Sequence, residues 1–272
     1  MKAMTSHSRR YVIAGAAVLA VAAGAYGIGQ FYPPDGPSAG TIVRAQNYVE
    51  DLADGQIPTR GRYVLVDAAS ARLFMIEDGH VKDIMRVIVG KPAAATPALT
   101  SVLHYATLNP YWHVPPDLAQ TLVAPRVLKE GNAYLVAKGY EVVSRFGNDA
   151  QVLSADSVDW KKVAAGQATV HLRQRPGPTN SMGQMKFNLA HGNSIFLHDT
   201  PKKELFAQTE RNLSNGCVRL EDAPRFARWL LGDDPPPLGT VAPEQHVAIP
   251  SGVPITIAYL DTRAQAQLAG LQ

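Results

Sequence analysis

Cys217 and His198 are the residues of this chain whose types and spacing could perform covalent chemistry. Cys217 is the single cysteine among 272 residues, so a disulfide within the chain is excluded. A cysteine thiol becomes a nucleophile when a nearby base accepts its proton, and histidine is the usual base. The turn-forming sequence Ser214-Asn215-Gly216 directly precedes the cysteine, and a buried structural cysteine does not usually follow such a turn. The pair therefore indicates a thiol nucleophile and its base.

The charge balance argues against a nucleic acid as partner. The chain has 26 Lys and Arg against 23 Asp and Glu, and Lys2, Arg9 and Arg10 lie in the first ten residues without an acidic neighbour. The remainder is therefore neutral, whereas nucleic-acid binding needs a basic surface. The other histidines lack the spacing of metal ligands, so we expect neither a metal ion nor a cofactor.

The N-terminus has the features of an export segment. Its basic first ten residues precede residues 11–29, an uncharged run of 19 residues, which is about the length of a membrane-spanning helix. Residues 1–31 are therefore predicted to be either a retained inner-membrane anchor or a cleaved signal peptide. Both alternatives predict an exported, periplasmic protein. A linker rich in Pro and Gly, with a short helix over residues 42–52, follows within residues 32–60.

Short β-rich runs and turns dominate residues 61–262, so these residues are expected to form a mainly β domain with a few short helices. Asp78-Gly79 is a hairpin signal between two of the runs. The expected strands cover residues 63–66, 72–76, 81–89, 170–173, 186–189, 194–198 and 254–259. The expected helices cover residues 202–207 and 223–231.

Residues 109–170 differ in pattern from the sequence around them. They begin with the aromatic and proline-rich run 109–116, and a short helix over residues 118–123 is expected to break near Pro125. We interpret this segment as an α/β cap inserted into the β domain. Residues 263–272 are expected to be a C-terminal tail.

Residues 61–262 resemble the L,D-transpeptidases with a YkuD-type catalytic domain, and are most similar to proteobacterial members that carry a capping insertion. The family signature is a histidine, a spacer, and then Ser/Thr-His-Gly-Cys followed by an apolar residue. Here 15 residues separate His198 from Ser214-Asn215-Gly216-Cys217-Val218. Three other stretches agree with the family in the same order, namely 89–92 with 96–97, 109–116, and 173–178 with 186–187.

The resemblance implies a fold of the β-sandwich or β-barrel type and a role for each motif residue. Cys217 is the expected nucleophile and His198 the expected base, with the imidazole oriented by the main-chain carbonyl of Asp199. The backbone N–H groups of Asn215, Gly216 and Cys217 are expected to form the oxyanion hole. Asn215 stands where the family usually has histidine, and this departure leaves acceptor choice and pH dependence open more than activity. The expected substrate contacts are Arg219, Ser214, Phe196, Trp112, Tyr111 and Arg173, and Arg219 could instead stiffen its loop.

The resemblance also implies a reaction on peptidoglycan peptide stems. The thiol would attack the carbonyl of the third residue of a tetrapeptide, meso-diaminopimelate in such bacteria, release D-Ala, and pass the acyl group to an amine. A 3→3 cross-link is the usual product, while a 1→3 link, attachment of a lipoprotein lysine and exchange of the terminal D-amino acid stay open. Carbapenem β-lactams are expected inhibitors. The alternatives are a carboxypeptidase or endopeptidase on the same scaffold, and an inactive scaffold protein that binds the cell wall.

Overall fold

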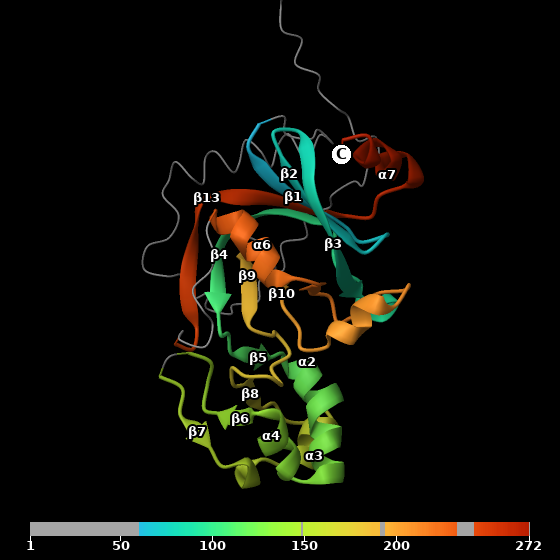
Figure 1. The fold of residues 1–272 in the computed structure, drawn as a ribbon. Coiled ribbons are helices and arrows are strands. Elements are labelled where there is room, and N and C mark those ends of the chain that lie inside the picture. The colour runs from blue at the N-terminus through green and yellow to red at the C-terminus, as the bar shows by residue number, and fades with distance from the viewer. Residues whose placement is uncertain (1–59, 148, 191–193, 233–241, 272) are drawn as a thin grey trace, which may run out of the picture.

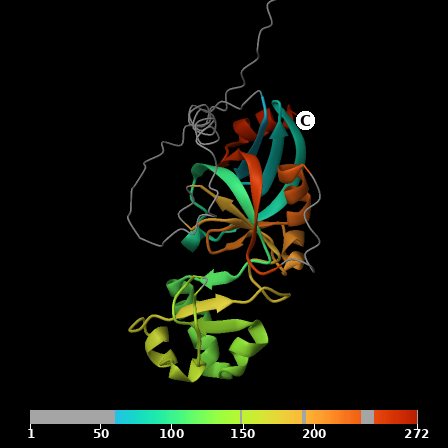
Figure 2. The ribbon, with the colours of Figure 1, turned by 90° about the vertical axis from the view of Figure 1, so that its left-hand side faces the viewer.

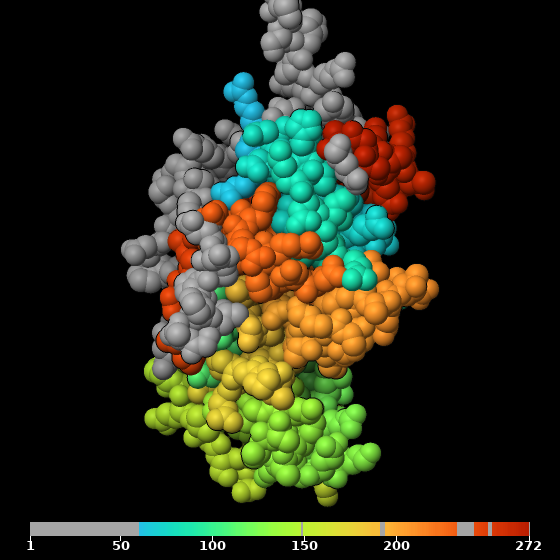
Figure 3. Space-filling model, in the orientation of Figure 1, coloured from blue at the N-terminus to red at the C-terminus, as the bar shows by residue number. Residues whose placement is uncertain are grey.

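The computed structural model describes residues 60–147, 149–190, 194–232 and 242–271, which form a β-barrel lobe and a smaller cap (Figure 1). The cap lies at one end of the barrel (Figure 2), and in the space-filling view it forms the lower lobe (Figure 3). The predicted anchor or signal peptide, the linker and the helix over residues 42–52 lie outside the described residues. None of the helices that the structure describes is both long and apolar enough to span a membrane.

The barrel is a single closed sheet. Its strand order is β11-β3-β12-β10-β9-β4-β13-β1-β2, and β2 also pairs with β3, which joins the two sides of the sheet. Such closure leaves fewer unpaired strand edges. This architecture confirms the predicted mainly β, barrel-like domain. The strands are β1 (Arg62–Asp67), β2 (Arg72–Glu77), β3 (His80–Gly90), β4 (Leu99–Leu108), β9 (Met185–Leu189), β10 (Leu197–His198), β11 (Asn212–Ser214), β12 (Val218–Leu220) and β13 (Gln245–Ala258).

Alternating side chains fill the barrel and set the position of its helix α6 (Ala223–Leu231). Val64 and Val66 of β1 point into the interior cluster, and Phe226 of α6 packs edge-on against Phe187 at 4.9 Å between ring centroids. The Asp222 carboxylate accepts a hydrogen bond from the Arg225 N–H at the start of this helix. The helix has the predicted bounds, because its cap, its apolar face and the glycine that follows it are all local signals.

Helix α7 (Thr262–Ala269) occupies the segment predicted to be a tail, so that prediction was wrong. Ala264 and Leu268 are one helical turn apart and both are buried. Leu268 joins Tyr63 and Phe74 on the outer face of β1 and β2, where every second residue is also apolar. A two-faced apolar strand needs such a cover, which gives the C-terminal segment its structural role.

The cap has a four-stranded sheet and a hydrophobic core of its own. The sheet order is β5-β8-β6-β7, with strands β5 (Trp112–Val114), β6 (Tyr140–Val143), β7 (Val152–Leu153) and β8 (His171–Gln174). Because β8 pairs with both β5 and β6, the insertion extends beyond its predicted end at residue 170. The chain re-enters the barrel only at β9. The remaining cap elements are α4 (Ala133–Lys138), η3 (Ala155–Ser157) and α5 (Trp160–Ala164).

The helix near the start of the cap does not break at Pro125, contrary to the sequence prediction. The segments α2 (Pro116–Leu118), η2 (Ala119–Val123) and α3 (Ala124–Glu130) follow one another without an interruption. Pro125 lies in the first turn of α3, and η2 just before it is a π-helical turn, in which the Ala124 N–H bonds to the Ala119 carbonyl. The wider turn separates the proline ring from the carbonyl with which it would collide in a regular α-helix.

Candidate active site

Neighbouring strands place His198 and Cys217 on the same face of the sheet. Strands β10 and β12 run parallel, with Leu197 paired to Val218 and His198 paired to Arg219. Leu197 and Val218 are fully buried inside the barrel. Because successive side chains alternate across a strand, His198, Arg219 and Cys217 project from the outer face. Cys217 is therefore the diagonal cross-strand neighbour of His198, as the spacing of the sequence motif requires.

The turn that carries Cys217 is fixed to the end of β3 by a buried threonine. The Thr96 hydroxyl accepts from the Gly90 N–H and donates to the Gly216 carbonyl, each at 2.8 Å. Gly216 has φ of 116°, a conformation that favours glycine, which explains this residue of the motif. The Lys91 N–H also donates to the Ser214 carbonyl at 3.0 Å. The 89–92 and 96–97 stretches of the resemblance therefore act as the support of the cysteine turn.

Ser214 closes this turn from inside and is not placed to touch a substrate, which differs from its predicted role. Its side chain is 1 % exposed, and its hydroxyl donates to the Cys217 carbonyl at 2.6 Å. The same hydroxyl accepts from the Gly216 N–H at 3.1 Å. Of the three N–H groups predicted for the oxyanion hole, that of Gly216 is therefore already bonded. Within the described residues, no acceptor is recorded for the N–H groups of Asn215 and Cys217.

Asp199 orients His198 through its main chain, as predicted. The imidazole Nδ1 lies 2.5 Å from the Asp199 carbonyl oxygen, which can only accept, so Nδ1 carries the hydrogen and Nε2 carries the lone pair. The Asp199 carboxylate is itself held by the Lys203 ammonium at 2.6 Å and by the Gln184 N–H at 2.9 Å. A side chain at Gly183 would collide with this carboxylate, since an added Cβ would lie 2.4 Å from Oδ2.

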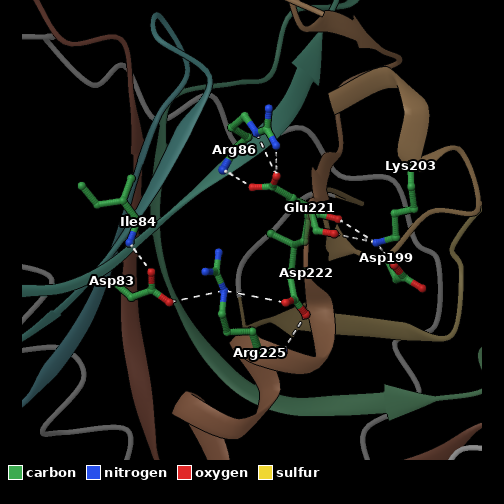
Figure 4. Close-up of polar contacts among 9 residues, drawn as sticks. Asp83, Ile84, Arg86, Asp199, Lys203, Glu221, Asp222 and Arg225 are labelled. Carbon is green, nitrogen blue, oxygen red and sulfur yellow. Dashed lines mark hydrogen bonds and ion pairs between the residues drawn. The ribbon is translucent and has the colours of Figure 1, made fainter. Parts of the chain in front are cut away.

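Lys203, from the short helix η4 (Lys203–Ala207), connects Asp199 to the end of β12. Its ammonium also donates to the Glu221 carbonyl at 2.8 Å, while the Glu221 carboxylate binds Arg86 of β3 (Figure 4). The sequence predicted this helix over residues 202–207, one residue longer than observed. It did not identify Lys203 as a site residue, because nothing in the local sequence indicates that its side chain bonds to Asp199. The carbonyl that orients His198 is thus part of a fixed network rather than a free turn.

Burial favours the neutral forms of both the thiol and the imidazole. Burial and the positive charge of Arg219 lower the pKa of His198 to about 4. Burial also raises the pKa of the Cys217 thiol, against the opposite effect of a backbone hydrogen bond at Phe196 and the charges of Arg219 and Lys186. The thiol donates to the Ser194 carbonyl at 3.7 Å, a weak contact that leaves it free to turn. Proton transfer to His198 would therefore accompany attack and not precede it.

Lys186 is a candidate functional residue that the sequence analysis missed. It lies directly across from His198 in the antiparallel pairing of β9 and β10, with its ammonium 5.0 Å from the centre of the Phe196 ring. Burial lowers the pKa of Lys186 and of Arg219. The signal was a single lysine between the buried Met185 and Phe187, which places it on the outer face. Only the strand pairing, however, shows that this face carries His198.

The predicted cap contacts lie at two different places. Trp112 packs on the cap core, with its ring 6.2 Å from that of Tyr140. Arg173 donates to the Glu141 carboxylate at 2.8 Å and covers the Tyr111 ring at 4.4 Å. Trp112 is therefore a structural residue, while Arg173 is already paired.

Tyr111 lies at the junction between cap and barrel, where its N–H donates to the Glu244 carboxylate at 2.6 Å. Nearby His113 has a pKa lowered by burial, and it lies within electrostatic range of Glu244, Lys186 and Arg173. This junction thus adjoins the sheet face that carries His198. The described residues contain no group of three His, Cys, Asp or Glu side chains that could hold a metal ion.

Comparisons with known proteins identify the family of the chain. Residues 61–255 match the sequence model of the L,D-transpeptidase catalytic domain, YkuD. A Haemophilus influenzae protein named "Putative L,D-transpeptidase" is 33% identical over 175 residues, which are 64% of this chain and 35% of that protein. The chain thus spans about a third of the length of this curated relative.

Two of the solved structures matched by the chain are L,D-transpeptidases. An L,D-transpeptidase from Mycobacterium smegmatis has 16% sequence identity and a TM-score of 0.34, over 72% of this chain and 58% of that one. The catalytic domain of the E. faecium L,D-transpeptidase, acylated by ertapenem, has 12% identity and a TM-score of 0.35, over 74% of this chain and 100% of that one.

Proposed function

The chain belongs to the family of L,D-transpeptidases with a YkuD catalytic domain, and from this premise we propose that it cross-links peptidoglycan peptide stems through a thioester on Cys217. One observation carries the proposal. His198 and Cys217 lie on neighbouring strands and on one face, with Nδ1 of His198 committed to the Asp199 carbonyl. The remaining ring nitrogen is then an acceptor on the face that bears the thiol.

In the acylation step, Nε2 of His198 accepts the proton of the Cys217 thiol as Sγ attacks the carbonyl carbon of the third stem residue. A C–S bond forms, the C–N bond to the terminal D-Ala breaks, and His198 returns the proton to the departing amine. The depressed pKa of His198 suits this role, because a neutral imidazole is available as a base at all pH values well above about 4.

In the second step an acceptor amine attacks the thioester. His198 takes the proton of the amine, the new C–N bond forms, and the C–S bond breaks to regenerate the thiol. The N–H groups of Asn215 and Cys217 are the proposed donors to the oxyanion in both steps, since the Gly216 N–H is bonded to Ser214. Peptidoglycan lies outside the cytoplasmic membrane, so we also propose that the protein is exported; cell fractionation tests this location.

Mass spectrometry of disaccharide-tetrapeptide incubated with the purified protein tests the proposal. A dimer that has lost one D-Ala, formed by the wild-type protein and absent with Cys217→Ala, is the expected result. Tripeptide alone would indicate a hydrolase instead. A carbapenem gives a parallel test, because ring opening of the β-lactam by Cys217 would add the mass of the drug to the wild-type protein and not to the variant.

A further inference from the structure

Two cations flank the base of this site, and within the described residues neither is paired with an anionic side chain. Strand β10 lies between β9 and β12, so Lys186 faces His198 from one side and Arg219 faces it from the other. β9 and β10 are adjacent in the barrel (Figure 1). Throughout the described part of the chain, neither Lys186 nor Arg219 forms a hydrogen bond or ion pair with a protein group, and the one close contact of the Lys186 ammonium is the Phe196 ring.

Such an arrangement is costly unless an anion completes it. Both side chains are only partly exposed, so both cations have given up part of their hydration. Other cations near the site are paired, as Lys203 is with Asp199 and Arg173 is with Glu141. Glu244 attracts Lys186 from a distance but forms no ion pair with it, and one of its oxygens accepts from the Tyr111 N–H. These two cations without an anionic partner among the described residues therefore indicate a binding site for an anionic group of a ligand.

The position of the cations determines which anion can reach them. His198 must contact the leaving amine in the first step and the attacking amine in the second, so both amines occupy one place. Adjacent strands are about 4.8 Å apart, and Lys186 and Arg219 are the direct cross-strand neighbours of His198. In an α-amino acid the amine and the carboxylate share one carbon atom, so that the carboxylate lies within about 3–4 Å of the amine. A carboxylate so placed therefore lies beside the base that the two cations flank.

We propose that Lys186 and Arg219 form a carboxylate site beside Cys217 that selects acceptors whose attacking amine and a free carboxylate share one carbon atom. This inference rests on the proposed function and names the acceptor. The leaving D-Ala has this chemistry, and so does the free end of meso-diaminopimelate in a second stem. A free D-amino acid has it too. The site thus favours the 3→3 link and terminal D-amino acid exchange.

The same site disfavours the other two acceptors that the sequence left open. The amine of a stem L-Ala is bonded to a carbon whose carboxyl group is already an uncharged amide. The side-chain amine of a lipoprotein lysine lies several bonds from the nearest carboxylate. Neither presents a carboxylate at the distance set by Lys186 and Arg219. A 1→3 link or lipoprotein attachment would leave both cations unpaired in the acyl-transfer step.

Partitioning of the acyl-enzyme between two acceptors tests the carboxylate site. The protein is incubated with disaccharide-tetrapeptide and equal concentrations of D-methionine and D-methioninamide, and the exchange products and tripeptide are quantified by mass spectrometry. The ratio of products does not depend on how fast the acyl-enzyme forms. Charge-assisted hydrogen bonds predict a preference for D-methionine of about 10- to 100-fold. Without the site, the amide would react at least as well, because its amine is less basic and less protonated near neutral pH.

Three variants test the contribution of Lys186 to this preference. Lys186→Met should bring the preference for D-methionine close to one, Lys186→Arg should retain most of it, and Lys161→Met, on the exposed surface of the cap, should leave it unchanged. Equal use of the two acceptors by the wild-type protein would overturn the carboxylate site, as would an unchanged preference in Lys186→Met. The wild-type ratio decides even if Lys186→Met fails to fold. Release of D-Ala with equal use of both acceptors would refute this inference alone, whereas absence of any D-Ala release would refute the proposed function itself.

Discussion

The Nδ1 of His198 lies 2.5 Å from the carbonyl oxygen of Asp199, the residue that follows it in the chain. A contact between neighbouring residues would by itself be easily lost, since His198 ends the two-residue strand β10 and Asp199 lies just beyond it. It is stabilised because the Asp199 carboxylate is bonded to Lys203 and to the Gln184 N–H. The direction of the His198 imidazole therefore depends on the Lys203 side chain, which bonds to the Asp199 carboxylate and not to the imidazole.

Replacing Lys203 by Met is expected to lower kcat without removing the nucleophile. The Asp199 carboxylate would lose one of its two anchors, so that its carbonyl holds the His198 ring less firmly. We expect kcat to fall by about 3- to 10-fold, because the imidazole is still present as a base but is less well oriented toward the thiol. KM should change little. Steady-state release of D-Ala measures both constants.

Lys202→Met is the matched control for this variant, because Lys202 is exposed and its side chain has no recorded bond among the described residues. The ion pair of Lys203 is partly exposed, so its loss should change the free energy of unfolding by no more than about 1 kcal/mol. Equal kcat values for the two variants would show that Lys203 does not position His198.

Alkylation of Cys217 is expected to speed up continuously with pH. Burial raises the pKa of this thiol above its ordinary value, and the imidazole beside it is neutral, so no thiolate–imidazolium pair exists at rest. The rate with iodoacetamide should rise about tenfold per pH unit across the neutral range. Mass spectrometry of the carbamidomethyl adduct measures it. A rate that is already constant from about pH 6 upward would instead reveal a preformed ion pair.

The stability of the protein is expected to depend on His198 in the acidic range. Its pKa is lowered from 6.5 to about 4 in the folded protein, so the unfolded chain binds the proton more tightly. The stabilisation is complete above about pH 6.5 and is lost as the pH falls toward 4. The shift corresponds to an upper value on the order of 3 kcal/mol. Urea denaturation between these pH values should show a smaller pH dependence for His198→Asn than for the wild type.

Local sequence signals predicted the elements whose formation needs no distant partner. The first three strands and the hairpin at Asp78-Gly79 follow from alternating apolar residues and a turn, and α6 follows from Asp222 and Gly232. The spacing of His198 and Cys217, through the family resemblance, predicted that these two residues lie together, as the pairing of β10 and β12 shows. Each of these signals lies within a few residues of the strand, turn or helix that it predicts, or within one sequence motif.

Long-range pairing decided the features that the sequence did not reveal. β8 belongs to the cap because of its pairing with β5 and β6, although its pattern is that of any short strand. Helix α7 matters because β1 has apolar residues on both faces and needs a cover. Lys186 became a candidate only when β9 was found beside β10. In each case the residue type was visible in the sequence and its neighbour was not.

Replacing Thr96 by Val is expected to disturb both the fold and the nucleophile. Valine keeps the shape of threonine but removes the hydroxyl, so the Gly90 N–H and the Gly216 carbonyl would both stay buried without a partner. Each unpaired group should destabilise the protein by roughly 1–3 kcal/mol. The Gly216 carbonyl fixes the turn before Cys217. Acylation by a carbapenem, measured at a low temperature at which the variant is folded, should therefore also be slower.

Thr100→Val is the control, since the Thr100 hydroxyl makes only a long contact of 3.4 Å with Thr256. Thermal melting and stopped-flow acylation should then separate the two effects: a loss of stability without slower acylation would mean that Thr96 supports the barrel but not the cysteine turn.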